Sequence, residues 1–123
     1  MQVESGLEIT SIADIPATGT GLGSSSAFTV GLLNALHAQL RQPVSAEILA
    51  QKACLVEIEL CKQPIGKQDQ YASAFGGMNI FEFNRDDTVS VETLHMGKDV
   101  EKLLFQNLLI FFTGSTRSAS SIL

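Results

Sequence analysis

The sequence predicts an α+β fold on three observations. Residues 78–83 and 88–94 alternate apolar and polar side chains across a short polar turn, a pattern typical of a β-hairpin. Residues 27–40 carry apolar side chains at helical spacing, which indicates an amphipathic helix. Apolar residues make up 45% of the 123 residues, enough to build a packed core and unlike the composition of a disordered chain.

The first half of the chain is predicted to be mainly helical after one strand. Near alternation of β-branched and polar residues predicts a strand over 7–15, which Pro16 ends. A loop rich in glycine and hydroxyl groups follows at 17–26. The helix over 27–40 ends at Gln42-Pro43, and Ser45 gives a cap signal for a second helix to about residue 61 or 62. A third helix is expected over 67–75, after the break at Pro64 and Gly66.

The second half is predicted to contain the hairpin, a helix and a buried strand. A short helix is expected over 98–105, and the nearly continuous apolar run at 108–113 predicts a strand buried on both faces. Residues 115–123 look like the start of a further helix. Five side chains are expected in the core: Cys54 and Cys61, seven residues apart on one helix, and Phe105, Phe111 and Phe112.

Composition excludes several classes of protein. Thirteen acidic against eight basic residues give a net charge of −5, which argues against binding nucleic acid. No apolar run is long enough to span a membrane, and the N-terminus lacks the pattern of a secretory signal. Two cysteines cannot form a four-cysteine zinc site, and neither His37 nor His95 has a cluster of ligands beside it. We therefore expect a single soluble, cytoplasmic domain.

The glycine-rich segment at 16–27 is the most informative part of the sequence. It joins a predicted strand to the start of a helix, where unpaired N–H groups and the helix dipole favour an anion such as phosphate. A glycine-serine turn with a helix cap and no ligand is the alternative. A P-loop would need a lysine after the last glycine, and a Rossmann fingerprint would need glycine at Ser24, so neither pattern fits.

The run Gly21-Leu22-Gly23-Ser24-Ser25 resembles the phosphate-binding loop of the GHMP kinases, whose signature is P-x-x-x-G-L-G-S-S-A. Ser26 stands in place of the usual alanine, and one extra residue separates Pro16 from the core of the motif. The resemblance implies that the chain binds ATP. The residues that it assigns to the nucleotide are Gly19, Gly21, Leu22, Gly23, Ser24, Ser25 and Ser26.

Acidic residues further along the chain supply a second motif. Phosphoryl transfer needs one carboxylate to orient or deprotonate the acceptor hydroxyl, and oxygen ligands to hold magnesium. The available acids are Glu57, Glu59 and Asp69, although a solvated helix face is the simpler interpretation for Glu59. The segment from Pro64 to Asp69 resembles the galactokinase-like P-x-G-x-x-D, with its aspartate twelve residues after Glu57. The resemblance implies Glu57 and Ser25 as Mg²⁺ ligands and Asp69 as the catalytic base.

The motifs look most similar to the branch that phosphorylates D-glycero-D-manno-heptose 7-phosphate at the anomeric hydroxyl. Lys67 and Arg117 are the candidate contacts to this substrate, with a solvent-exposed surface position as the alternative for each. Kinases for other sugars, such as galactose or fucose, are one alternative. A non-catalytic phosphate-binding or interaction module is another.

The resemblance covers nearly the whole chain but only the middle of a family protein. It implies the N-terminal α+β domain of these kinases, similar to the second domain of ribosomal protein S5, incomplete at both ends and without the C-terminal domain. Because nucleotide and sugar bind between the two domains in this family, we expect little or no turnover from the isolated chain. We also expect it to self-associate through the face formed by residues 108–123.

Overall fold

The structure, a computed structural model, describes residues 6–13 and 21–111. The chain divides into two compact units, the first within Met1–Phe75 and the second within Gly76–Ser115, and each is considered by itself. Within the described residues, no helix is both long enough and apolar enough to cross a lipid bilayer.

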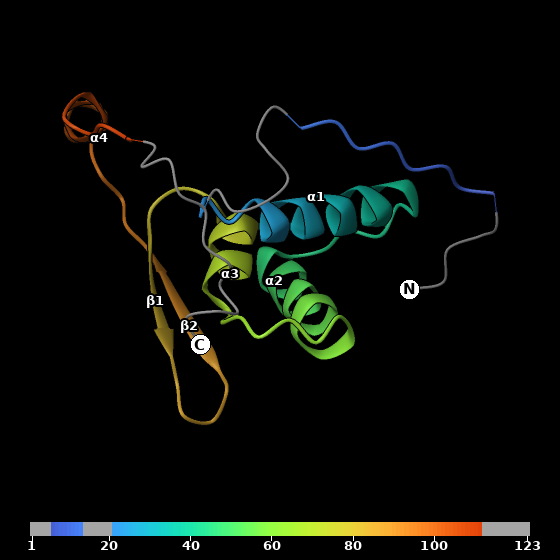
Figure 1. The fold of residues 1–123 in the computed structure, drawn as a ribbon. Helices are drawn as coiled ribbons and strands as arrows, with labels where there is room; N and C mark the ends of the chain where they lie inside the picture. Colours follow the sequence, from blue (N-terminus) through green and yellow to red (C-terminus); the bar gives the residue numbers. More distant parts are fainter. Residues whose placement is uncertain (1–5, 14–20, 112–123) are drawn as a thin grey trace. The chain divides into compact units, whose positions relative to one another are not determined.

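The first unit is a small cluster of helices (Figure 1). Its elements are α1 (Ser24–Gln39), α2 (Ala46–Cys54), the π-helical segment η1 (Leu55–Leu60) and α3 (Gln68–Phe75). Helices α1, α2 and α3 all pack against one another. The buried apolar side chains are Val30, Leu49, Ala50, Ala53, Cys54 and Tyr71. Two of these are alanines, so α2 approaches its neighbours closely.

The helices predicted between residues 27 and 75 are confirmed, with one shift that matters for the site. Helix α1 begins at Ser24, three residues before the expected start, because Gly23 adopts a left-handed conformation (φ 66°) and serves as its N-cap. The three serines therefore form the first turn of the helix and are not part of the loop. Ser45 caps α2 as predicted, its hydroxyl accepting a hydrogen bond from the Ile48 N–H at 3.3 Å.

Helix α2 passes without a break into η1, and the wider turn of the π-helix changes which face each residue occupies. Residues seven apart share a face only in a regular α-helix. The prediction that Cys54 and Cys61 both lie in the core is therefore wrong: Cys54 is buried and Cys61 is exposed. The helical run ends where Lys62 adopts a positive φ of 53°, two residues before Pro64.

The strand expected over residues 7–15 is wrong as far as the structure describes it. Residues 7–13 have no regular secondary structure and are exposed, and residues 14 and 15 lie outside the described residues. A strand is stable only when its backbone groups pair with a neighbour. No described strand pairs with residues 7–13, so their alternating pattern alone does not produce one.

The second unit contains the predicted hairpin. Strands β1 (Asn79–Phe83) and β2 (Val89–Thr93) pair antiparallel, with Phe81 opposite Val91. The turn is held by the Asp86 carboxylate, which accepts hydrogen bonds from the Thr88 N–H at 3.1 Å and the Thr88 hydroxyl at 2.6 Å. These bonds favour the ionised form and lower the pKa of Asp86.

Helix α4 (Lys98–Gln106) confirms the helix expected over 98–105, but the apolar segment after it is not a strand. Residues 108–111 are irregular and exposed, and Phe105 and Phe111, expected in the core, are 61% and 78% exposed. A strand buried on both faces needs neighbours on each side, and the only described sheet has two strands, neither of which pairs with this segment. Phe112 and the helix expected over 115–123 lie outside the described residues.

Candidate functional site

The glycine loop leads into the N-terminus of α1 through two glycines that adopt a left-handed backbone conformation. Gly21 and Gly23 have φ angles of +67° and +66°, a region that residues with a Cβ rarely adopt. The Ala27 N–H bonds to the Gly23 carbonyl at 2.9 Å, and no side chain caps the helix. An α-helix leaves its first N–H groups without an internal acceptor, so this end is suited to bind an anion. Gly19 lies outside the described residues.

Asp69 lies against this loop. It belongs to the first turn of α3, and a Cβ built on Gly23 would stand 3.3 Å from its Cγ and 3.4 Å from its Oδ2. The two segments, 46 residues apart in sequence (69 − 23 = 46), therefore meet at a contact that only a glycine allows without strain. The exposed carboxylate of Asp69 is thus placed next to the start of α1.

Among the described residues, neutral donors hold the buried carboxylate of Glu57. Its side chain is 4% exposed, and it lies in the first turn of η1. It accepts four hydrogen bonds, from the hydroxyls of Ser25, Ser26 and Thr29 and the side-chain amide of Gln70. A buried charge needs such partners or a counter-ion, and here the partners are three hydroxyls and one amide. In the described part of the chain, the carboxylate therefore forms its hydrogen bonds with uncharged groups.

The two residues expected to bind magnesium are in direct contact. The Ser25 hydroxyl donates to Glu57 Oε1 at 2.8 Å. Two adjacent oxygen ligands of one octahedral Mg²⁺ ion lie about 3 Å apart, given metal–oxygen distances near 2.0–2.1 Å. A hydroxyl and a carboxylate both supply oxygen ligands of the kind that Mg²⁺ binds, so the Ser25–Glu57 pair fits this ion. In the part of the chain that the structure describes, no group of three or more His, Cys, Asp or Glu side chains is arranged so that it could hold a metal ion. The other ligands would then be waters and phosphate oxygens, as is usual for Mg²⁺.

The other candidate residues lie in varied settings. Ser26 is 2% exposed and its hydroxyl donates to Glu57, so only its backbone N–H remains for a phosphate. Leu22 is 59% exposed. Glu59 is exposed and lies 4.0 Å from Lys62, as expected for a solvated acid. Lys67 is partly exposed, two residues before Asp69. Arg117 lies outside the described residues.

Sequence reasoning did not find two residues that contact Glu57. Thr29 lies four residues after Ser25 on the same face of α1, a spacing that could have indicated it. Gln70 follows Asp69 directly, and nothing in the local pattern shows that its fully buried side chain turns toward Glu57.

Cys54 lies close to the same cluster, three residues before Glu57. Burial raises the pKa of the Cys54 thiol; the positive charge of Lys67 partly opposes this shift, and the negative charge of Glu57 adds to it. The thiol is therefore held in its neutral form and acts as a small core side chain.

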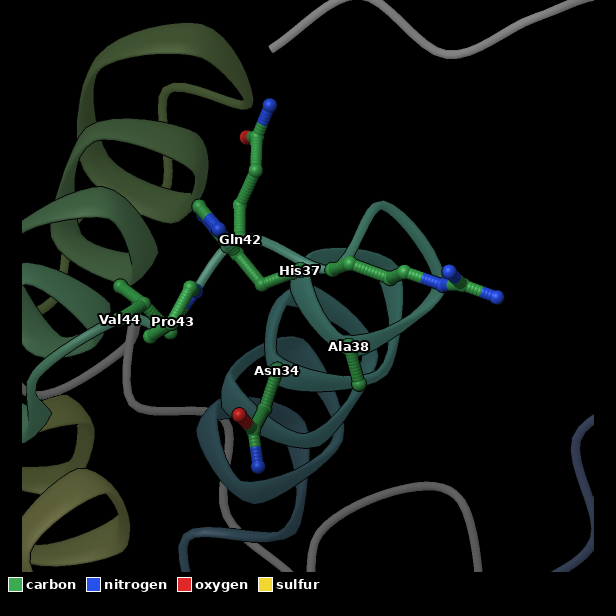
Figure 2. A pocket seen from close by; sticks show the side chains of 7 residues that line it. Asn34, His37, Ala38, Gln42, Pro43 and Val44 are labelled. Carbon is green, nitrogen blue, oxygen red and sulfur yellow. The ribbon is translucent and has the colours of Figure 1, made fainter.

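A separate depression of about 410 Å³ lies at the other end of α1, beside the connection to α2 (Figure 2). Asn34, His37, Gln42 and Val44 are among the residues that line it. His37 is buried, and its Nε2 lies 2.8 Å from the Lys52 ammonium, which links α1 to α2. This contact gives His37 a role in helix packing, away from the glycine loop.

The comparison with known proteins assigns the chain to a family. Residues 1–77 match the family described as the GHMP kinases N terminal domain. The chain belongs to the GHMP kinase family. Its α+β fold is that of the family's N-terminal domain, as the sequence predicted.

Individual members of the GHMP kinase family show the extent of the likeness. The chain is 36% identical over 110 residues to a D-glycero-alpha-D-manno-heptose 7-phosphate kinase of Campylobacter jejuni, a match that covers 89% of this chain and 32% of that protein. It is 34% identical over 111 residues to a galactokinase of Pyrococcus furiosus, covering 88% of this chain and 29% of that protein. A crystal structure described as a D-glycero-D-manno-heptose 1-phosphate kinase from Bacteroides thetaiotaomicron matches with a TM-score of 0.67 and 40% identity, over 71% of this chain and 28% of that one. The chain thus spans about a third or less of the length of these relatives.

Proposed function

We propose that this chain forms the phosphate- and magnesium-binding part of an ATP-dependent sugar kinase. One observation carries the proposal: the N-terminus of α1, the Ser25–Glu57 pair and the Asp69 carboxylate meet at the glycine loop. An anion site, a pair of oxygen ligands and an exposed carboxylate are the groups that phosphoryl transfer needs together.

The phosphates of ATP would bind to backbone N–H groups of the glycine loop and the first turn of α1. Gly21 and Gly23 present no Cβ, so the backbone can approach the phosphates closely. This mode of binding needs no basic surface, which agrees with a chain of net charge −5.

Ser25 and Glu57 would hold Mg²⁺, which, when bound, neutralises the charge that develops on the phosphate oxygens. Asp69 would accept the proton of the acceptor hydroxyl as that oxygen forms its bond to the γ-phosphorus, while the bond to the β,γ-bridging oxygen breaks and ADP leaves. The exposure of Asp69 suits it to meet a sugar, whereas the buried Glu57 suits a fixed ligand.

We propose the anomeric hydroxyl of D-glycero-D-manno-heptose 7-phosphate as the acceptor. Two of the relatives described above are named as heptose phosphate kinases, at 36% and 40% identity. Lys67, close to Asp69, and Arg117 are proposed as contacts to the substrate. Galactose is the second candidate, because a relative at 34% identity is named a galactokinase.

The test is an ADP-release assay on the complete gene product that contains these residues, with heptose 7-phosphate, galactose, fucose and mevalonate as acceptors. Loss of a general base lowers turnover by about 10²–10⁴-fold, and we expect that loss for Asp69→Asn. Glu59→Gln is the matched control, since it removes an exposed carboxylate of a neighbouring helix and should leave turnover unchanged. Full activity of Asp69→Asn would refute the assignment of the base, and activity on none of the sugars would refute the function. The chain of 123 residues, assayed in parallel, is expected to show little or no turnover.

A further inference from the structure

The two oxygens of the Glu57 carboxylate have different surroundings. Oε2 accepts from the Ser26 hydroxyl at 2.7 Å and the Gln70 amide at 2.5 Å, and both donors belong to fully buried side chains, 2% and 0% exposed. Oε1 accepts from Ser25, which is exposed, and from Thr29 at the longer distance of 3.2 Å. Oε2 is therefore held by buried donors, whereas Oε1 is bonded to Ser25, two residues after the last glycine of the loop.

The hydrogen bond to Glu57 determines how the Gln70 amide is oriented. Its Oε1 is buried and has no hydrogen-bond partner among the described residues. A buried acceptor without a partner is costly and rare in folded proteins. Rotating the amide would put this oxygen against the carboxylate, so the donor contact to Glu57 determines the side chain's position.

A carboxylate needs such contacts to stay in one orientation. The last torsion of a glutamate side chain is broad and has no strong preference of its own, so its hydrogen bonds decide where each oxygen points. Ser26 reaches Oε2 from α1 and Gln70 reaches it from α3, two elements that pack against each other. Two short bonds from separate helices to one oxygen restrict the rotation of the whole group.

We propose that Ser26 and Gln70 are positioning residues that form a buried clamp on Glu57 Oε2 and so direct Oε1, with the Ser25 hydroxyl, toward a divalent cation. This inference rests on the proposed function, because it takes Glu57 as a metal ligand. Outer partners that orient a ligand commonly change metal affinity by 10–100-fold when they are removed. Ser26 stands where the family signature has alanine, so the clamp in this chain has a donor that this signature lacks.

The experiment measures Mn²⁺ binding in the presence of ADP, by electron paramagnetic resonance of free Mn²⁺, on the complete gene product. Ser26→Ala and Gln70→Met each remove one donor to Oε2, and each is expected to weaken Mn²⁺ binding about tenfold. ADP affinity in EDTA should stay unchanged, which a general loss of structure would not allow. Ser26→Thr keeps the hydroxyl and should retain most of the affinity. Glu59→Gln is the matched control: it removes an exposed carboxylate of the same helical segment as Glu57 and should leave Mn²⁺ affinity within about threefold of the parent.

The outcomes separate this inference from the function on which it rests. Parent-like Mn²⁺ affinity in Ser26→Ala and Gln70→Met, with a large loss in Glu57→Gln, would overturn the clamp and leave the metal role standing. Parent-like affinity in Glu57→Gln would overturn the metal role and the clamp together. If Gln70→Met does not fold, Ser26→Ala decides alone, since it deletes one hydroxyl and restores the residue found in the signature.

Discussion

Replacing Gly23 by alanine tests whether the glycine loop and Asp69 are in contact, as the structure has them. Gly21 provides an internal control: its φ of +67° almost equals the +66° of Gly23, but no atom of the described residues lies within 4 Å of the Cβ that it would gain. The two substitutions therefore introduce the same backbone strain and differ in the contact with Asp69.

The expected magnitudes follow from this difference. A left-handed alanine costs about 1–2 kcal/mol, and the lower entropy of the unfolded chain returns about 0.4–1 kcal/mol. Gly21→Ala should therefore lower the free energy of unfolding by about 1 kcal/mol. In Gly23→Ala the new Cβ would stand 3.3 Å from Asp69 Cγ. Moving that side chain off its rotamer adds about 0.5–1.5 kcal/mol.

The assay is urea denaturation of the chain followed by helical circular dichroism, in a double-mutant cycle with Asp69→Ala. That substitution removes Cγ and Oδ2 and leaves the Cβ of residue 69 at an ordinary 3.6 Å. In the Asp69→Ala background, Gly23→Ala should lower the free energy of unfolding by no more than Gly21→Ala does. An equal cost for Gly23→Ala with and without the Asp69 carboxylate would refute the contact.

Three further predictions concern the rest of the chain. Exposed Cys61 should react with a thiol reagent much faster than Cys54, because Cys54 is buried and its pKa is raised. Cys61→Ser should remove the fast phase of the reaction, and two thiols that react equally fast would contradict the burial of Cys54. The carboxyl of Asp86, followed by NMR, should titrate below the usual aspartate range, and Thr88→Ala should raise its pKa. Because this folded-state pKa is lowered, the contribution of Asp86 to hairpin stability is present above its unfolded pKa and is lost as the pH falls through the folded one. The exposed apolar residues 108–111 should cause self-association, seen by light scattering as a mass above 13.2 kDa that rises with concentration; a monomer at high concentration would exclude it.

Local patterns were sufficient where a residue's neighbours in sequence determine its conformation. The cap at Ser45, the hairpin with its turn at Asp86, and the helix at Lys98–Gln106 are all encoded within a few residues, and all are confirmed. The glycine motif and the acid motif likewise identified the family from short runs of sequence.

Local patterns failed where the outcome depends on distant partners. Residues 7–13 and 108–111 have the alternation or apolarity of strands, but no described strand pairs with them, so their backbone stays irregular. Cys61 was placed in the core because a regular helix was assumed, and the π-helical turn at Leu55–Leu60 rotates it to the surface.

The sequence by itself determined that this chain carries a phosphate-loop motif before a helix and two acids at family spacing. Only the tertiary structure decided what surrounds those acids. The donors to Glu57 from α1 come from residues 28–32 positions away, and Asp69 meets Gly23 across 46 positions (69 − 23 = 46). Burial and hydrogen-bond partners are properties of packed helices, because they depend on which faces meet. The pairing of Ser25 with Glu57, and the burial of Ser26 and Gln70 behind them, therefore emerge only when α1, η1 and α3 come together.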